Sequence, residues 1–214
     1  MRPEEGVLTS RSRAIGAVLE LLTDELVVVC NGLPSREVYA LRDRPENFYM
    51  IGSMGLAPAI GLGVALAQPR RKVVVLDGDG NVLMAMGTLA TVGALKPRNF
   101  VHIVFDNEVY GSTGNQPTLS QTVRLEQVAK AAGYRHVERV RELDDAVYEA
   151  KTMLKEDGPS FLLVKVSELA EDVGRVGIEP AAMTERFRKA AVGAGGARVP
   201  VARPNATGDG PLPL

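Results

Sequence analysis

Two short apolar runs, each ending in small polar residues, constrain the fold more than any other feature. Lys72–Leu76 is followed by the sequence Asp-Gly-Asp-Gly-Asn, and Phe100–Phe105 is followed by Asp-Asn. Runs of β-branched and aromatic residues of this length are typical of buried parallel strands. Between them lies Val82–Leu95, which is long enough for one crossover helix before a Lys-Pro pair breaks it. The pattern therefore predicts a β-loop-α-turn-β unit.

The polar residues after these two strands predict a ligand site. Parallel strands joined by a right-handed crossover release their loops at the same edge of the sheet, so Asp79 and Asn107 should converge there. A carboxylate and an amide oxygen suit Mg²⁺, and Gly78 and Gly80 let a phosphate approach the backbone N–H groups. Gly-Asp-Gly alone is also an ordinary turn. It is the flanking strands and helix that favour a magnesium and phosphate site.

Strand-like and helix-like stretches alternate along the rest of the chain. We expect further strands at Leu26–Cys30, Asn47–Met50, His136–Val140 and Phe161–Val166. We expect helices at 10–22, Arg36–Arg42 with Ser35 as the N-cap, Ala59–Ala67, Leu125–Gly133, Asp144–Lys155 and Glu179–Val192. This alternation predicts an α/β fold with a doubly wound, mostly parallel sheet and helices on both faces.

One domain should cover residues 1–192, followed by a tail at 193–214. Nine of the 22 tail residues are Gly or Pro, which predicts disorder. Residues 108–118 are too polar and Gly-rich to form an element, and they follow Asn107 directly. They either fold over the ligand or form a plain surface loop.

Composition excludes several classes of function. The net charge is −1 with acids and bases interspersed, which argues against a nucleic-acid or membrane-surface partner. Apolar runs stay shorter than the roughly 18 to 20 residues that span a bilayer, and residues 1–5 do not read as a signal peptide, so we expect a cytoplasmic protein. Cys30 is the single cysteine and should be a buried, unreactive thiol. His102 and His136 are expected to be structural.

These motifs together resemble the thiamin diphosphate enzymes. Gly-Asp-Gly followed after 25 to 30 residues by an Asn pair is their metal-binding signature, and Asp106-Asn107 is a variant of that pair. The Gly-Ser-Met-Gly sequence at 52–55 is similar to their pyrimidine-binding turn. The resemblance implies thiamin diphosphate and Mg²⁺ as cofactors, with Asp79, Asn107 and the Val109 carbonyl as metal ligands. Gly52 would receive the 4′-amino group through its carbonyl, and Met54 would wedge between the two cofactor rings. The full set of cofactor-binding residues implied is Gly32, Ser35, Gly52, Ser53, Met54, Gly78, Asp79, Gly80, Asn81, Asn107, Val109, Tyr110, Gly111 and Ser112.

Further stretches narrow the resemblance to the sulfopyruvate and phosphonopyruvate decarboxylases. These stretches are Asn31–Glu37, Leu41–Pro45, Phe48–Gly55, Tyr110–Gln116 and Asp172–Arg175. The Tyr-Gly-Ser-Thr-Gly form of the loop after Val109 and the short chain favour the sulfopyruvate β subunits. Phosphonopyruvate decarboxylases join both cofactor-binding domains in one longer chain.

The resemblance implies an enzyme of the carboxy-lyase class that converts 3-sulfopyruvate to sulfoacetaldehyde and CO₂. An activating glutamate is expected on an α subunit with a pyrimidine-binding domain, in a hetero-oligomer containing two or more copies. On this chain Ser112 and Thr113 are candidates to touch substrate near the thiazolium. Arg36, or the partner, would bind the substrate tail.

Other functions stay open from the sequence. The substrate could be phosphonopyruvate, or the reaction an acetolactate-synthase-like carboligation. Outside the enzymes, the chain could be a structural subunit that binds a phosphate ligand. A Rossmann dinucleotide site is disfavoured, because no Gly-x-Gly-x-x-Gly follows the first strand.

Overall fold

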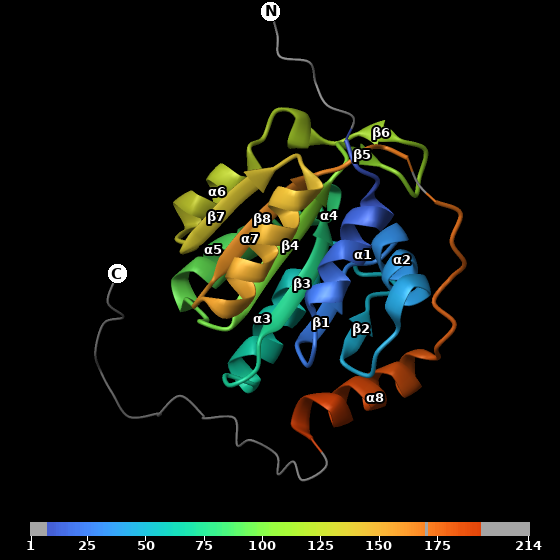
Figure 1. Ribbon diagram of the computed structural model, residues 1–214, viewed down its shortest axis with the longest axis vertical. Helices are drawn as coiled ribbons and strands as arrows, with labels where there is room; N and C mark the ends of the chain where they lie inside the picture. The colour runs from blue at the N-terminus through green and yellow to red at the C-terminus, as the bar shows by residue number, and fades with distance from the viewer. Residues whose placement is uncertain (1–7, 170, 194–214) are drawn as a thin grey trace, which may run out of the picture.

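A six-stranded parallel sheet forms the centre of the molecule (Figure 1). The computed structural model describes residues 8–169 and 171–193, so nearly all of the predicted tail lies outside the described residues. The strand order is β2-β1-β3-β4-β8-β7, and every neighbouring pair is parallel. The strands are β1 (Leu26–Val29), β2 (Asn47–Tyr49), β3 (Val73–Gly78), β4 (Phe100–Asp106), β7 (His136–Val140) and β8 (Ser160–Lys165). The predicted α/β fold with a parallel sheet is confirmed.

The central strands are buried on both faces, which explains their nearly continuous apolar sequences. All residues of β1, β4 and β8 are buried, and side chains alternate between two apolar clusters. Val27 and Val29 belong to one cluster, and Leu26 and Val28 belong to the other. The period of two along each strand therefore builds a core on each side of the sheet.

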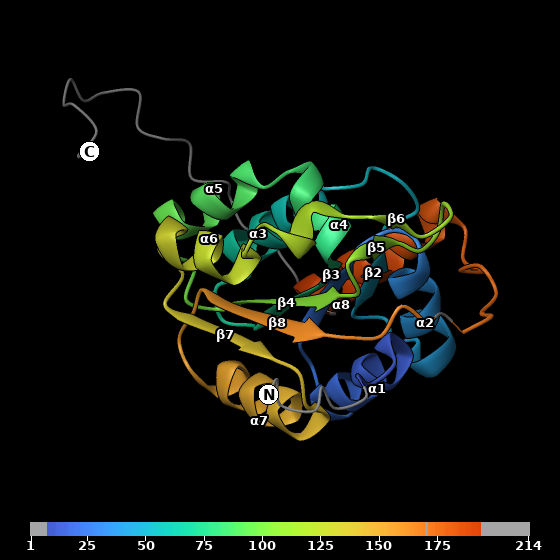
Figure 2. The same ribbon diagram turned by 90° about the horizontal axis from the view of Figure 1, so that it is seen from above.

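Helices cover both faces (Figure 2). One face carries α1 (Arg11–Leu21), α2 (Leu33–Arg42) and α7 (Leu143–Lys155). The other carries α3 (Ala57–Ala67), α4 (Asp79–Met84), α5 (Gly87–Leu95) and α6 (Leu125–Ala132). The last helix, α8 (Pro180–Val192), lies beside the edge strand β2.

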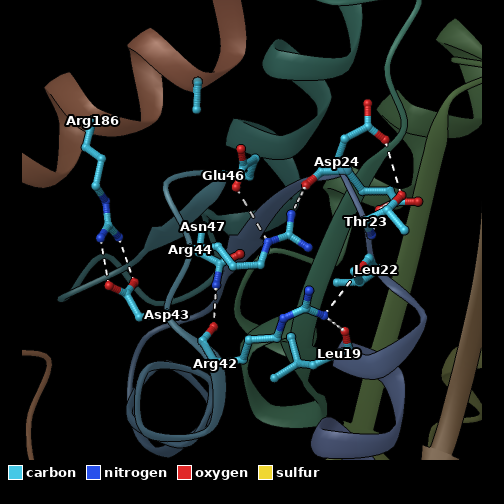
Figure 3. A network of polar contacts seen from close by, with 12 residues as sticks. Leu19, Leu22, Thr23, Asp24, Arg42, Asp43, Arg44, Glu46, Asn47 and Arg186 are labelled. Carbon is cyan, nitrogen blue, oxygen red and sulfur yellow. Dashed lines mark hydrogen bonds and ion pairs between the residues drawn. The ribbon is translucent and has the colours of Figure 1, made fainter.

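Polar contacts hold α8 against the β2 edge. Arg186 donates two hydrogen bonds to Asp43, at 2.7 and 2.8 Å (Figure 3). The Tyr49 hydroxyl donates to the same carboxylate at 2.8 Å. The Met183 sulfur accepts from the Tyr49 backbone N–H at 3.3 Å, and the Asn47 N–H donates to a loop carbonyl at 3.0 Å. Both outward N–H groups of β2 are therefore occupied.

The predicted single crossover helix at 82–95 is wrong. The structure has two helices, because α4 begins at Asp79 in the ligand loop and the chain turns at Ala85 before α5 starts. The turn packs against Gly55, where an added Cβ would lie 3.0 Å from the Ala85 Cβ. Because Gly55 is distant in sequence, the residues around Ala85 do not by themselves predict this turn.

Ser35 is not the N-cap of α2. The helix starts earlier, at Leu33, with Gly32 in the cap position at φ +88° and Pro34 in the first turn. The Ser35 hydroxyl donates instead to the Cys30 carbonyl at 2.7 Å, inside the protein. Pro34 has a fixed φ that suits a helix start, so it sets the boundary ahead of the serine.

The segment expected to lack secondary structure forms a short hairpin. Strands β5 (Val109–Tyr110) and β6 (Gln116–Pro117) pair antiparallel, and a 3₁₀ helix, η1 (Leu119–Gln121), follows. This hairpin brings residues well past Asn107 back to the same edge of the sheet.

Candidate functional site

Asp79 and Asn107 meet at the carboxyl edge of β3 and β4. The register pairs Gly78 with Phe105, so the residues that follow the two strands lie next to each other. Asp79 is 2 % exposed and Asn107 is 6 % exposed. The convergence predicted from the crossover topology is therefore present in the structure.

Three oxygen atoms face one another at this point. The Asn107 side-chain oxygen is 3.2 Å from Asp79 Oδ1 and 2.9 Å from the Val109 carbonyl oxygen. Turned over, the amide would place its nitrogen there and donate to both oxygens. Without a metal the turned-over amide satisfies these contacts, whereas a cation between the oxygens would favour the orientation in which the amide oxygen faces Asp79 and Val109. Adjacent ligands of octahedral Mg²⁺, each at about 2.0–2.1 Å from the ion, lie about 2.9 Å apart, so the spacing fits this ion.

The donor set consists of one carboxylate, one amide and one backbone carbonyl. Within residues 8–169 and 171–193, no three His, Cys, Asp or Glu side chains group closely enough to hold a metal. A hard cation with oxygen ligands and free positions for phosphate is therefore the metal that this set suits.

The second oxygen of Asp79 is held by hydroxyl groups from the far side of the hairpin. Asp79 Oδ2 accepts from Thr118 and, at 3.0 Å, from Ser120. Burial, with the neighbouring Asp106 charge, raises the pKa of Asp79 to about 6. The Ser120 hydroxyl also lies 2.9 Å from Asp106, whose other oxygen accepts from Lys165 at 2.9 Å. Sequence reasoning missed Thr118 and Ser120, which are 39 and 41 residues from Asp79 and stand in no motif.

A hollow opens above this site and is lined by most of the predicted cofactor residues. These residues are Gly32, Met54, Gly78, Asp79, Gly80, Asn81, Asn107, Val109, Tyr110, Gly111 and Ser112. The N-terminus of α2 borders the hollow and has no side-chain cap, so its first N–H groups, apart from Pro34, which has none, are available to a phosphate. Gly80 is required by packing, because an added Cβ would lie 2.5 Å from the Tyr110 ring.

Four predicted residues lie outside the lining of this hollow. Ser35 faces the interior, as described above. Gly52 and Ser53 are exposed in the loop that leads to Met54, and Ser53 has a φ of +55°. Thr113 is exposed, and its hydroxyl bonds to Gln116 at 2.8 Å within the hairpin. Of the two residues suggested to touch substrate, only Ser112 borders the hollow.

A buried chain of hydrogen bonds fixes the turn that carries Met54. The Gly55 N–H donates to Asn81 Oδ1 at 2.6 Å, and Asn81 Nδ2 donates to Asp77 at 2.5 Å. The other oxygen of Asp77 lies 3.0 Å from Nε2 of His102, and both side chains are fully buried. His102 thus acts at a distance from the hollow, as a structural residue that orients Asp77.

Arg11 is a third residue that sequence reasoning missed. It lines the hollow, is 4 % exposed, and forms two hydrogen bonds to Glu37 at 2.9 and 3.0 Å. Arg11 lies one turn before Ile15 on the apolar face of α1, and this position in the sequence indicates that its side chain is buried. Cys30 also lines the hollow, and burial raises the pKa of its thiol. The thiol is therefore buried and poorly ionised, in line with the structural role predicted for it.

Across the ranges that the structure covers, none of the helices combines the length and the apolarity that crossing a membrane requires.

Comparison with known proteins assigns the chain to a family. The family model described as thiamine pyrophosphate enzyme, C-terminal TPP binding domain, matches residues 30–164. The phosphonopyruvate decarboxylase of Streptomyces viridochromogenes is 50% identical over 170 residues, which are 79% of this chain and 43% of that protein. The sulfopyruvate decarboxylase subunit beta of Methanococcus maripaludis is 43% identical over 183 residues, which are 85% of this chain and 97% of that protein. The chain thus spans less than half the length of the phosphonopyruvate decarboxylases that it matches.

A solved structure supports the fold. Benzoylformate decarboxylase from Polynucleobacter necessarius aligns with a TM-score of 0.61 at 22% identity, over 76% of this chain and 34% of that chain. The motif match over residues 30–164 and the near end-to-end match to a β subunit agree with the site geometry. The chain therefore belongs to the thiamine pyrophosphate enzymes, in the group formed by the sulfopyruvate and phosphonopyruvate decarboxylases.

Proposed function

We propose that this chain is the diphosphate-binding β subunit of a thiamin diphosphate-dependent decarboxylase that converts 3-sulfopyruvate to sulfoacetaldehyde and CO₂. The observation that carries the proposal is the convergence of oxygens from Asp79, Asn107 and Val109 beneath a hollow with free helix N–H groups. Relatives named sulfopyruvate decarboxylase subunit beta match the chain at 39% to 43% identity.

The residues of this chain would position and neutralise the cofactor. Asp79, Asn107 and the Val109 carbonyl would hold Mg²⁺, and the N–H groups of Gly80, Asn81 and the α2 N-terminus would neutralise part of the negative charge of the diphosphate. Gly52 and Met54 would hold the pyrimidine and set the angle between the rings. When bound, thiamin diphosphate supplies the electron sink for the pair released as CO₂ leaves.

A partner would complete the site. Asp79 is the single carboxylate among the described residues that line the hollow, and the proposed metal would engage it. The glutamate that activates the pyrimidine must therefore come from elsewhere, and the name subunit beta of the relatives fits an α subunit with a pyrimidine-binding domain.

An exposed apolar surface gives this partner a place to dock. Ile51, Leu56, Met84 and Met86 are 62, 46, 62 and 38 % exposed. They flank the Met54 turn and the end of α4, two segments in contact through Gly55. Clustered exposed apolar side chains at the mouth of a ligand site are typical of a protein interface. We propose a hetero-oligomer in which the α subunit covers this surface, with two or more copies in the assembly.

The test is cofactor binding by an Asp79→Ala variant. We expect it to abolish the Mg²⁺-dependent binding of thiamin diphosphate, measured by isothermal titration calorimetry. Asp145→Ala, on the exposed face of α7, is the matched control and should bind normally. Binding unchanged from wild type in Asp79→Ala would refute the magnesium site and leave the structural-subunit alternative standing.

Phosphonopyruvate is the second candidate substrate, because the two phosphonopyruvate decarboxylases are 50% and 47% identical to this chain. Decarboxylation assays of the assembled enzyme with each acid separate the two substrates. An acetolactate-type activity would appear as carboligation of pyruvate in the same assays.

A further inference from the structure

We propose that Arg36 and Arg175 form the subsite for the anionic tail of the 2-oxo acid substrate. The inference rests on the proposed function and adds the groups that recognise the sulfonate or phosphonate.

The two arginines line a second hollow that shares a wall with the cofactor hollow. Asn31, Gly32 and Ser112 border both. The remaining lining comes from the loop after β2 and from residues 175–180, the segment that runs beside α2 toward α8 (Figures 1 and 2). This segment touches α2 directly, since an added Cβ at Gly177 would lie 3.3 Å from the Tyr39 hydroxyl.

Neither arginine has a protein counter-ion. Arg36, in the first turn of α2, is half-buried and forms no ion pair or side-chain hydrogen bond with a described residue. Arg175 is exposed and is equally without a carboxylate partner within the described ranges. Among the described residues, eight of the 13 other arginines bind carboxylates or carbonyls, as Arg11 and Arg186 do. Of the described residues that line this hollow, Glu179 alone is acidic, so two positive charges face one negative charge.

This charge balance and geometry suit an acidic tail. A guanidinium presents its N–H groups as a planar fork that matches the oxygens of sulfonate and phosphonate groups. One methylene separates the sulfonate of 3-sulfopyruvate from its keto carbon. The tail subsite must therefore adjoin the cofactor hollow, and the wall shared at Ser112 meets this requirement.

Kinetics of the assembled enzyme test the subsite. The substrates are 3-sulfopyruvate, 3-phosphonopyruvate and pyruvate, which lacks the tail. We expect Arg36→Gln and Arg175→Gln to lower kcat/KM for the preferred tailed acid by about 10- to 100-fold, chiefly through KM, because each loses a charge-assisted hydrogen bond. Activity with pyruvate should stay within about 3-fold of wild type. The tailed acid whose kcat/KM falls in these variants shows whether the subsite binds a sulfonate or a phosphonate.

A binding measurement and a matched control accompany the kinetics. The affinity for 3-sulfopropanoate, which keeps the sulfonate but has no keto group, should fall in the same two variants. Arg70→Gln, at an exposed arginine before β3, should change neither measurement. Arg36→Lys should recover part of the loss, because it restores the charge but not the fork.

The outcomes separate this inference from the function on which it rests. If Arg36→Gln does not fold, Arg175→Gln at its exposed position still decides the question. A ratio of kcat/KM between tailed acid and pyruvate that is unchanged in the variants overturns the subsite and leaves the decarboxylase. An assembled enzyme with no activity on any 2-oxo acid overturns the proposed function, and the subsite with it.

Discussion

Replacing Asn107 with aspartate should make the folding of this chain depend on magnesium. The change places a second carboxylate where the amide lies 3.2 Å from Asp79 Oδ1. Two unit charges at that distance repel by about 5 kcal/mol at an effective dielectric constant of about 20. The pair can relieve part of this by sharing a proton, so we expect the cation-free variant to lose roughly 2–4 kcal/mol of stability at pH 7.

A cation between the two carboxylates reverses the sign of this effect. The variant should bind Mg²⁺ more tightly than the wild type, because it offers two carboxylates in place of one. Adding millimolar MgCl₂ should therefore raise its melting temperature more than that of the wild type. Thermal unfolding followed by circular dichroism, with NaCl at matched ionic strength, measures this difference. Asn115→Asp, in the exposed hairpin loop, is the control and should show little response to Mg²⁺.

The same experiment distinguishes the two orientations of the Asn107 amide. If the nitrogen faces Asp79 and no cation binds there, Asn107→Asp loses two hydrogen bonds, and magnesium cannot restore stability. A variant that is destabilised equally with and without Mg²⁺ would refute the metal site, and with it the main support for the proposed function.

Three further predictions follow from single contacts. Gly80→Ala forces a Cβ to within 2.5 Å of the Tyr110 ring, so the hairpin should shift and thiamin diphosphate affinity should fall by about tenfold in calorimetry; normal affinity would show that the hairpin yields freely. Lys165→Met leaves Asp106 buried without its cation and should cost roughly 3–5 kcal/mol in urea unfolding, and a loss under 1 kcal/mol would contradict this. Burial raises the pKa of Asp43, but the hydrogen bonds from Arg186 and the Tyr49 hydroxyl outweigh burial and lower the pKa overall. The stability that this contact contributes is therefore present above the ordinary pKa near 4 and is lost as the pH falls through the lowered pKa. Cleavage within α8 by an acid-active protease should therefore accelerate below pH 4, and a flat profile would be evidence against the contact.

The central strands were predictable because they are buried on both faces. A run such as Val73–Leu76 must be apolar whichever neighbours it has, so the local sequence alone reveals it. The convergence of Asp79 and Asn107 followed from the same strands, since handedness leaves one arrangement for a short crossover.

The errors concern features that depend on contacts between distant segments. The turn between α4 and α5 packs against Gly55, which is distant in sequence. The start of α2 is set by Pro34, which precedes Ser35, the residue predicted as the N-cap. The hydroxyls that bind Asp79 and the Glu37 partner of Arg11 come from residues far away in sequence, and no local pattern identifies them. Sequence reasoning therefore located the residues at the strand ends but not those that hold them in place.

The attachment of α8 to β2 limits how this sheet can grow. Hydrogen-bonded addition of a seventh strand next to β2 would need the N–H groups of Asn47 and Tyr49, and both already have acceptors within the chain. A second polypeptide therefore cannot continue the sheet on this side. Contact with a neighbouring subunit on this side must instead run through loops and helices, and the loops that follow β1, β3 and β4 are the surface that the proposed α subunit would cover.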